Sequence, residues 1–436
     1  TQGVSSAASD VYKRQVTISS GGGSTKVFDS ADKLFELSPI HPIGLMLNGN
    51  IDCFGVPWEI IIKDFRDKHG SEGNRAVEEW AKYFIAFVED RPDVSNDHSM
   101  NYIRAVAETE LSRIKNEVSL RLLDFRNRSK ASLKRSLEDV ISPLLIDVMR
   151  DRITALLDSP VAKSIEAFSV EMLTEEYCSF LAPIIRNRLK PINVTPEAEL
   201  EITRLIVIAL RTSTPGDAST GLVIAGYGDG DNYPTVTSVE IDGYVKGKLK
   251  HSGIVTKAKI GQPELGNAVS FAQTDVIERL LGGADPRYVA KTSKYLSDIA
   301  QKLAPEIVRM LAPKISQKRK KSEAEFMEQI LLLIKERYVN EIAPALQLEF
   351  RTEFERMIAL MPKMELIELA EALVSITVIE RKATFNEGTV GGPIDVAFIT
   401  KHEGFVWIKR KHYFEPELNP RYFWRRFGQS NKGAIP

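Results

Sequence analysis

The chain has 436 residues, enough for about two or three domains, and its 58 Lys and Arg residues balance its 59 Asp and Glu residues. With a balanced charge, the chain as a whole is not expected to attract nucleic acid or a membrane surface. No apolar run reaches the ~18–20 residues of a membrane span. The two cysteines, Cys53 and Cys178, cannot form a disulfide framework. We therefore expect a cytoplasmic globular protein with reduced thiols and no membrane partner.

The first fifteen residues are expected to be foreign to the fold. Ser5 to Gln15 has no apolar periodicity and reads as the translation of a transposon adapter, because the codons for Asp10 to Gln15 spell a transposon end. We therefore leave residues 1–15 out of the predicted fold. Thr1 is likewise left out of the predicted chemistry, although it is the first residue of the printed chain.

Two segments with strand character follow. In Lys26 to Leu37, residue alternation puts Lys33 on the same face as Phe35 and Leu37, so the lysine should point inward. A buried amine without a partner is costly, which makes an accidental placement there unfavourable. The alternative is a lysine in water at the end of a strand. Ile43 to Asn50 is an apolar run that ends at Gly49, and it predicts the next strand.

Two long stretches carry the period of amphipathic helices, from Pro57 to about Arg211 and from Pro286 to about Phe385. Proline is expected to break the first stretch in four places. These are Arg91-Pro-Asp, Ser159-Pro, Lys190-Pro-Ile-Asn and Val194-Thr-Pro. The charged run Lys318-Arg-Lys-Lys321 is expected to interrupt the second stretch.

Hairpins are predicted between and after these helical stretches. Gly221 to Tyr227 and Pro234 to Gly243 are two apolar runs joined by a glycine-rich turn. That turn, Gly226-Tyr-Gly-Asp-Gly-Asp231, superficially resembles a phosphate or calcium loop but lacks the remaining residues of either motif. Near the C-terminus, Thr389 to Thr400 and Gly404 to Lys409 predict a second hairpin around the turn Lys401-His-Glu-Gly404.

Five segments in this order resemble blocks of proteasome-type β subunits, which are N-terminal-nucleophile hydrolases. They are Lys26 to Leu37, Ile43 to Asn50, Gly221 to Gly243, Ser270 to Gly282 (a turn and a helix), and Thr389 to Lys409. The resemblance implies an α+β fold, a four-layer αββα sandwich with enlarged helical layers. Its core would be residues 16–56, 215–285 and 386–414, with helical insertions at 57–214 and 286–385 and a basic, aromatic tail at 415–436.

The resemblance also implies a chemistry, hydrolysis of a peptide or protein by an N-terminal threonine whose own amine is the base, with no cofactor and no metal. Lys33 would keep that base neutral, and the backbone N–H of Gly49 would face the oxyanion. Glu387 stands where the family has an aspartate, and Thr389 would replace a serine by a one-residue shift, since the family's serine position is Val390.

The family has another serine, on the turn before the helix of the segment Ser270 to Gly282. Either Ser270 or Gln273 would occupy that position here. Val16 to Ser20 resembles the segment just after the family's first carboxylate, so we expect the nucleophile's strand to be missing from this chain and the fragment to be inactive. By resemblance the whole protein would be a threonine peptidase or amidase that assembles as a homo-oligomer.

Two alternatives remain open at this stage. The departures at Glu387 and Val390 favour a non-catalytic proteasome-like scaffold or assembly subunit, whereas Lys33 favours an enzyme. The tail from Lys409 to Phe427 interleaves cations with aromatic residues, which could bind single-stranded nucleic acid. Packing of its arginines on aromatic rings is the preferred interpretation, so a nucleic-acid partner is not expected.

Overall fold

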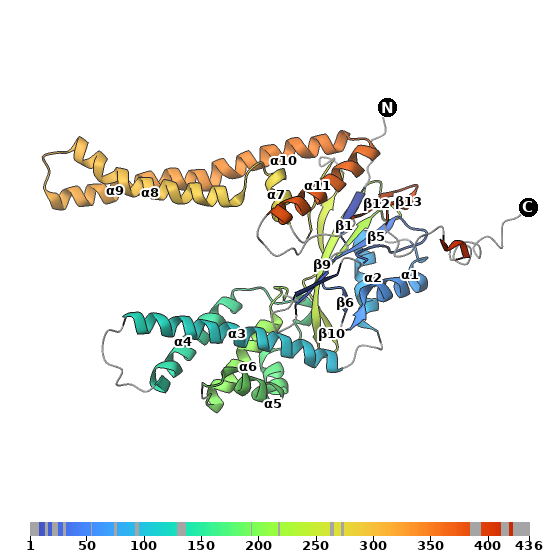
Figure 1. Cartoon of the computed structure of the whole chain (residues 1–436), viewed down its shortest axis with the longest axis horizontal. Helices are drawn as coiled ribbons and strands as arrows, with labels where there is room; N and C mark the ends of the chain where they lie inside the picture. The colour runs from blue at the N-terminus through green and yellow to red at the C-terminus, as the bar shows by residue number, and fades with distance from the viewer. Residues whose placement is uncertain are drawn as a thin grey trace, which may run out of the picture. The chain divides into compact units, whose positions relative to one another are not determined.

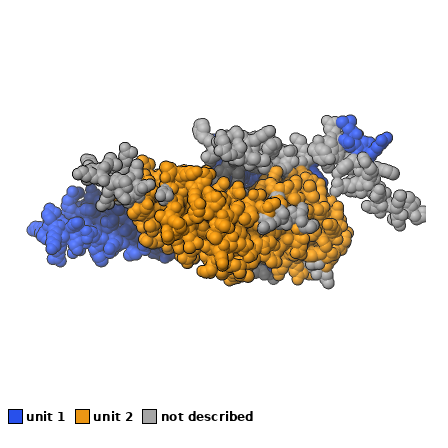
Figure 2. All heavy atoms as spheres, turned by 90° about the horizontal axis from the view of Figure 1, so that it is seen from below, with its two compact units in different colours: residues 1–30, 258–398, 407–436 blue, residues 31–257, 399–406 orange. Residues whose placement is uncertain are grey.

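The computed structural model describes residues 8–13, 16–19, 25–28, 32–53, 55–73, 76–91, 96–128, 137–192, 194–216, 219–261, 266–271, 274–383, 394–410 and 418–421. Its contacts divide the chain into two compact units, coloured separately in Figure 2. The first unit comprises residues 1–30, 258–398 and 407–436, and the second comprises residues 31–257 and 399–406. Helices and antiparallel strands occur together, so the predicted α+β class is confirmed.

The second unit is built on a six-stranded sheet of order β10-β9-β8-β5-β4, with β11 paired to β9. The strands are β4 (Leu34–Glu36), β5 (Ile43–Gly49), β8 (Thr220–Gly226), β9 (Thr235–Val245), β10 (Lys248–His251) and β11 (Val255–Lys259). Successive pairs from β4 to β10 are antiparallel. The strand predicted at residues 43–50 and the hairpin predicted at residues 221–243 are therefore confirmed.

Two helices, α1 (Trp58–His69) and α2 (Val77–Glu89), cover one face of this sheet (Figure 1). A short ribbon of β6 (Asp52–Cys53) and β7 (Val56–Pro57) leads into α1. Alternate residues of β5 enter the core beneath the helices, together with large aromatic side chains. This core includes Leu45, Leu47, Leu222, Ile224, Trp58, Phe65, Trp80 and Phe84. The apolar residues that alternate along the strands thus pack against the apolar residues that recur every 3.6 positions along the helices.

The remaining helices of this unit form a separate bundle with its own core. They are α3 (Asn96–Arg128), α4 (Leu137–Leu157), α5 (Val170–Leu189) and α6 (Pro196–Arg211), with a 3₁₀ turn at Lys163–Ile165. Helices end or begin at all four predicted proline breaks, which confirms them. Pro143 and Pro183, by contrast, lie inside α4 and α5, because packing of the flanking turns outweighs the lost hydrogen bond.

A buried polar network joins α3 to the sheet. The Lys250 ammonium donates to Asp242 Oδ2 at 2.7 Å and to the Tyr102 hydroxyl at 3.0 Å. The Tyr102 hydroxyl donates to the same carboxylate oxygen at 2.6 Å, and the Gly216 N–H donates to Asp242 Oδ1 at 2.9 Å. Burial and the neighbouring Asp242 carboxylate raise the pKa of Tyr102 well above its ordinary value. Lys250 and Asp242 therefore form a hydrogen-bonded ion pair almost out of water.

The first unit contains a three-stranded sheet of order β1-β12-β13, formed by β1 (Ala8–Lys13), β12 (Ile394–Thr400) and β13 (Gly404–Lys409). Helix α11 (Lys363–Ala383) packs Ile367 against Val396 and Phe398 of β12. A second helix, α7 (Thr274–Leu281), confirms the helix predicted after Ser270. A two-stranded ribbon pairs β2 (Val16–Ser19) with β3 (Thr25–Phe28).

The C-terminal hairpin is confirmed, and Gly404 supplies the positive φ of 73° that its turn requires. Residues 399–406 of this hairpin belong to the second unit. The N-terminal segment departs from expectation, because Ala8–Lys13 forms β1 beside β12 although residues 1–15 were left out of the predicted fold. Strand pairing uses backbone N–H and C=O groups, which every sequence carries, so it does not require an apolar side-chain pattern.

A long helical arm belongs to the first unit. It comprises α8 (Pro286–Leu311), α9 (Gln317–Arg337), a π-turn at Tyr338–Ile342, and α10 (Ala343–Leu360), and α9, the π-turn and α10 run continuously (Figure 1). The break between α8 and α9 falls at residues 312–316. The prediction that Lys318 to Lys321 interrupts the helix is therefore wrong, because these four residues lie in the first turns of α9, where their side chains are solvated.

Removing the Asp242 carboxylate should destabilise the second unit strongly. We expect Asp242→Ala to lower the free energy of unfolding by about 3–5 kcal/mol, because the Lys250 ammonium would remain buried without its counter-charge. Chemical denaturation measures this loss. The control is Lys248→Ala, which removes an exposed ammonium from its ion pair with Glu89 and should have a much smaller effect, because solvent screens that charge. Equal effects of the two substitutions would contradict this account of the network.

Candidate functional site

Lys33 lies immediately before β4, and its backbone C=O accepts a hydrogen bond of 2.7 Å from the Leu47 N–H of β5. The side chain is buried, with 6% of the residue exposed. Burial lowers the pKa of the Lys33 amine from 10.5 to about 8. The sequence-based expectation of a buried lysine is therefore confirmed, and the alternative of a solvated strand-end lysine is excluded. An amine with this pKa can hold or release a proton near neutral pH.

Gly49 ends β5, opposite Thr220 of β8, with a φ of +77°. A Cβ at this position would lie 2.3 Å from the Ser219 carbonyl oxygen. Both observations require glycine for reasons of backbone geometry alone. The backbone geometry at Gly49 is therefore compatible with binding an oxyanion and equally compatible with a turn that has only a structural role.

The sheet brings Lys33 and Gly49 to the same end. The register pairs Leu34 with Met46, and the Lys33 carbonyl reaches the Leu47 N–H, so Gly49 lies just two residues beyond the neighbour of Lys33 on the adjacent strand. Glu387 and Thr389, with Val390 and Gln273, lie outside the residues that the structure describes.

Ser270 is described, and it belongs to the first unit. Its hydroxyl is 3.4 Å from the Glu278 carboxylate of α7, across the first turns of that helix. This long contact ties the segment before α7 to the helix itself. The structure thus gives Ser270 a local role at the start of α7.

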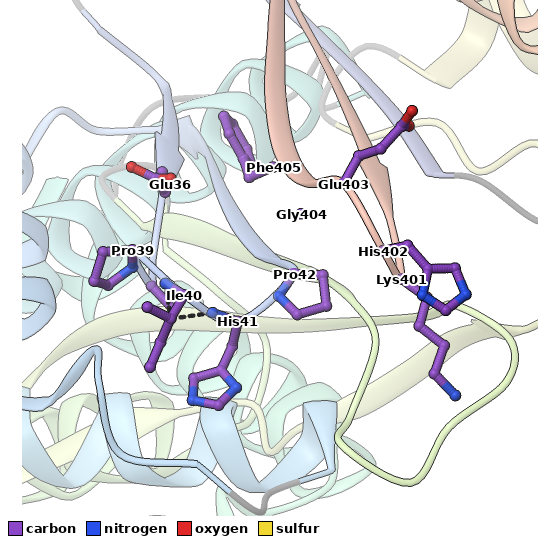
Figure 3. A pocket seen from close by; sticks show the side chains of 11 residues that line it. Glu36, Pro39, Ile40, His41, Pro42, Lys401, His402, Glu403, Gly404 and Phe405 are labelled. Carbon is purple, nitrogen blue, oxygen red and sulfur yellow. Dashed lines mark hydrogen bonds between the residues drawn. The ribbon is translucent and has the colours of Figure 1, made fainter. Parts of the chain in front are cut away.

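A small pocket lies at the opposite end of β4 and β5, within the second unit (Figure 3). It is lined by residues 36 and 38–42 and by residues 401–405 of the C-terminal hairpin turn. Its volume of about 180 Å³ is below the ~300 Å³ at which ligand pockets usually begin. Gly44 lets the turn approach β5, since a Cβ there would lie 2.8 Å from the Phe405 ring. Sequence reasoning missed this pocket, and Gly44 within an apolar run was its one signal.

His41 is the most constrained side chain of the pocket loop. Its Nδ1 lies 3.1 Å from Asp229 Oδ1, its ring is 5.6 Å from that of Trp80, and its buried Nε2 has no hydrogen-bond partner among the described residues. The Ser38 hydroxyl accepts from the His41 backbone N–H at 2.8 Å and donates to the Gly70 carbonyl at 2.6 Å. Ser38, His41 and Asp229 are thus not arranged as a catalytic triad, because the hydroxyl bonds to backbone rather than to imidazole.

The orientation of the pocket side chains supports the same conclusion. In Figure 3 the His41 ring points away from Gly404 and Phe405, while Lys401 and Glu403 point in opposite directions. The Lys401 ammonium instead donates to Asn232 Oδ1 at 3.0 Å, which fastens the hairpin turn to the loop between β8 and β9. We interpret the pocket as a packing feature of the second unit.

Comparisons of the chain with protein-family models, with curated proteins and with solved structures found no match. Within the described ranges, no helix is both long enough and apolar enough to cross a membrane. One contact bears on the C-terminal tail, where the Arg410 guanidinium stacks 4.6 Å from the Trp407 ring centre. Most of the predicted basic, aromatic tail, residues 411–417 and 422–436, lies outside the residues that the structure describes.

Replacing Gly49 should destabilise the protein whether or not it takes part in chemistry. We expect Gly49→Ala to lower the free energy of unfolding by about 1–3 kcal/mol, because alanine is strained at positive φ and its Cβ would meet the Ser219 carbonyl. Denaturant titration measures the change. Gly247→Ala is the control, since its φ of 76° is equally positive but a Cβ there meets no atom within 4 Å. A loss no greater than the control's would argue against the steric part of this prediction.

The lowered pKa of Lys33 should make stability depend on pH in a known direction. Between about pH 8 and 10.5 the unfolded chain holds a proton on Lys33 that the folded chain has released, so stability should rise with pH in this window. Relative to Lys33→Met, the wild type should gain up to ~3 kcal/mol across it. Denaturation at the two ends of the window measures the gain.

The matched control is Lys82→Met, at an exposed position of α2. It should leave the slope of stability against pH unchanged, because this position is in contact with solvent in the folded chain as well as in the unfolded chain. If the wild type and Lys33→Met showed parallel pH profiles, the Lys33 amine would have its ordinary pKa.

Proposed function

We propose that this chain is a proteasome-type N-terminal-nucleophile hydrolase, a threonine-type peptidase or amidase acting on a peptide or protein. The observation that carries the proposal is the buried Lys33, with a pKa lowered to about 8, at the end of the sheet where β5 terminates in Gly49. A buried cation-forming group is costly in a protein core and is concentrated at functional sites. Its position also matches the family's lysine just before Leu34 and Phe35.

The chemistry follows from that lysine. A hydroxyl nucleophile needs a neutral base at working pH, and a nearby ammonium lowers the pKa of an amine base by charge repulsion. At neutral pH the Lys33 amine is largely protonated and can fill this role. A backbone N–H at the end of β5 would then stabilise the oxyanion, a contribution of about 3 kcal/mol in comparable enzymes.

The finer architecture belongs to the same proposal. We propose that the six-stranded and three-stranded sheets are the inner layers of a four-layer αββα sandwich. Helices α1 and α2 on the first sheet, and α11 on the second, support this arrangement as outer layers. The proposed partners are the substrate and further copies of the chain, and no cofactor is required by this chemistry.

A non-catalytic scaffold of the same fold is the second candidate. It is favoured by the geometry of Gly49, which steric requirements explain without any oxyanion, and by Glu387 and Val390, which depart from the family's pattern. A scaffold has no use for a buried lysine at this position, so Lys33 separates the two candidates.

The test uses protein expressed from the complete gene, because the resemblance places the attacking residue upstream of Val16. Lys33→Met should abolish self-processing and lower peptide hydrolysis by at least ~100-fold, since it removes the charge that keeps the base neutral. Intact mass, N-terminal sequencing and fluorogenic-peptide turnover measure these effects. Circular dichroism establishes that the variant is folded.

Lys82→Met is again the control and should process and turn over normally. Processing that survives in folded Lys33→Met would refute the role given to Lys33. A wild-type protein that neither processes itself nor hydrolyses peptides would favour the scaffold.

A further inference from the structure

Helices α8 and α9 of the arm pack against each other as an antiparallel hairpin within the first unit (Figure 1). On α8 the seam uses the buried Ala300, Ala304 and Val308. On α9 it uses half-buried residues such as Leu331 and Lys335, and none of the residues of α9 is fully buried. The hairpin therefore covers only one side of each helix.

A second apolar stripe runs along each helix beside the seam. We call it the arm face, and it consists of Tyr288, Tyr295, Leu303 and Met310 of α8 with Phe326, Ile330 and Ile334 of α9. These residues are between 41% and 78% exposed. Monomeric proteins rarely expose a continuous apolar surface of this kind, and a larger patch usually marks an interface.

The two stripes lie on the same side of the hairpin. Leu303 precedes the seam residue Ala304 by one position and Ile330 precedes Leu331 by one, so both are rotated from the seam by about 100° in the same sense. The other stripe residues of α8 lie about 120–180° from the seam in that sense. In two antiparallel helices, equal rotations in the same sense point to the same side. The arm therefore presents one apolar face made by both helices.

The arm face is symmetric along its length. On α9, Phe326 and Ile334 are equally spaced about Ile330. On α8, Tyr295 and Leu303 are equally spaced about the half-buried Ile299, and so are Tyr288 and Met310. Ile299 and Ile330 each lie about three and a half helical turns from the tip of the hairpin. One two-fold axis across the middle of the arm therefore suits both helices.

Charges at the two ends of the α9 stripe obey the same symmetry. Arg319 and Glu323 form an intrahelical pair on one side of the stripe, 3.8 Å apart, and Arg337 and Glu341 form another on the other side, 3.1 Å apart. Rotation about Ile330 places Arg319 opposite Glu341 and Glu323 opposite Arg337. Opposite charges would meet at both ends of an antiparallel pair, which is the complementarity that a self-associating surface needs.

We propose that a second copy of this chain packs on the arm face, with the two arms antiparallel, to form a four-helix bundle around Ile299 and Ile330. Two antiparallel helix pairs with facing apolar stripes give a standard bundle core. The antiparallel arrangement also separates the basic clusters at Lys318 to Lys321, which a tip-to-tip arrangement would bring together. This inference is independent of the proposed peptidase activity.

The first test is the mass of the full chain in solution, by sedimentation velocity and light scattering. The wild type should be a dimer, or a higher assembly built from dimers. Ile330→Glu should raise the dimer dissociation constant by about 100-fold or more, because it buries two like charges beside the axis. Gln329→Glu adds the same charge at an exposed position about 100° around α9 from Ile330 and should leave association unchanged.

The second test is a charge exchange. Glu323→Arg alone and Arg337→Glu alone should each weaken the dimer, since each places like charges opposite one another. The double variant should restore it, because the pair is re-formed across the axis. Ile330→Cys should cross-link two chains under oxidation, whereas Gln329→Cys should not.

Three results would overturn the proposal. They are a wild-type chain that stays monomeric at about 100 µM, association that survives Ile330→Glu, or a double charge variant that is weaker than both single variants. If the monomeric chain bound anionic vesicles and Ile330→Glu abolished that binding, the arm face would be assigned to lipid instead of to a second copy.

Discussion

The antiparallel pairing of β5 with β8 is the constraint on which the second unit depends. It joins segments that helices α1 to α6 separate in the sequence. The entropy cost of closing this long loop is offset by burial of both strands over nearly their whole length. Once β5 is held by β8, its register with β4 places Lys33 opposite Leu47, and its last residue turns at Gly49. The α1 and α2 core and the candidate site both follow from this pairing.

The same sheet carries two buried lysines with different physical settings. Lys250 is compensated by the Asp242 carboxylate at 2.7 Å, whereas for Lys33 burial is the cause that lowers the pKa. The first arrangement pairs the ammonium with a buried counter-charge and, through Tyr102, fastens α3 to the sheet. The second makes the proton easier to remove, so keeping the ammonium charged at neutral pH is a cost to folding.

Both helical stretches are amphipathic, yet they use their apolar residues differently. The α3–α6 bundle encloses its own core, so its apolar residues are buried within one chain. In the described part of the chain the arm has two helices in cross-section, and two helices cannot enclose a wide apolar stripe. Within that part the second stripe stays exposed, and its symmetry in spacing and charge is the reason why a second copy is proposed to cover it.

The sequence alone predicted local features well. An apolar run ending in glycine identified β5, and glycine-centred turns identified the hairpins β8–β9 and β12–β13. Proline marked the ends of α2, α4 and α5 and the start of α6, and strand parity predicted a buried Lys33. These features depend on residues close in the chain, whose geometry is set by the period of the backbone. The strand β1 was missed, because a strand at the edge of a sheet pairs through its backbone and does not need an alternating side-chain pattern.

Tertiary structure alone decided what depends on distant residues. The requirement for glycine at position 49 comes from the Ser219 carbonyl, and the ion pair of Lys250 comes from the pairing of β10 with β9, which carries Asp242. The pocket beside Gly44 comes from a hairpin near the other end of the chain. The exposure of the arm face likewise depends on how few helices surround it. Periodicity predicts which residues avoid water, but only packing determines which of them have found a partner within the same chain.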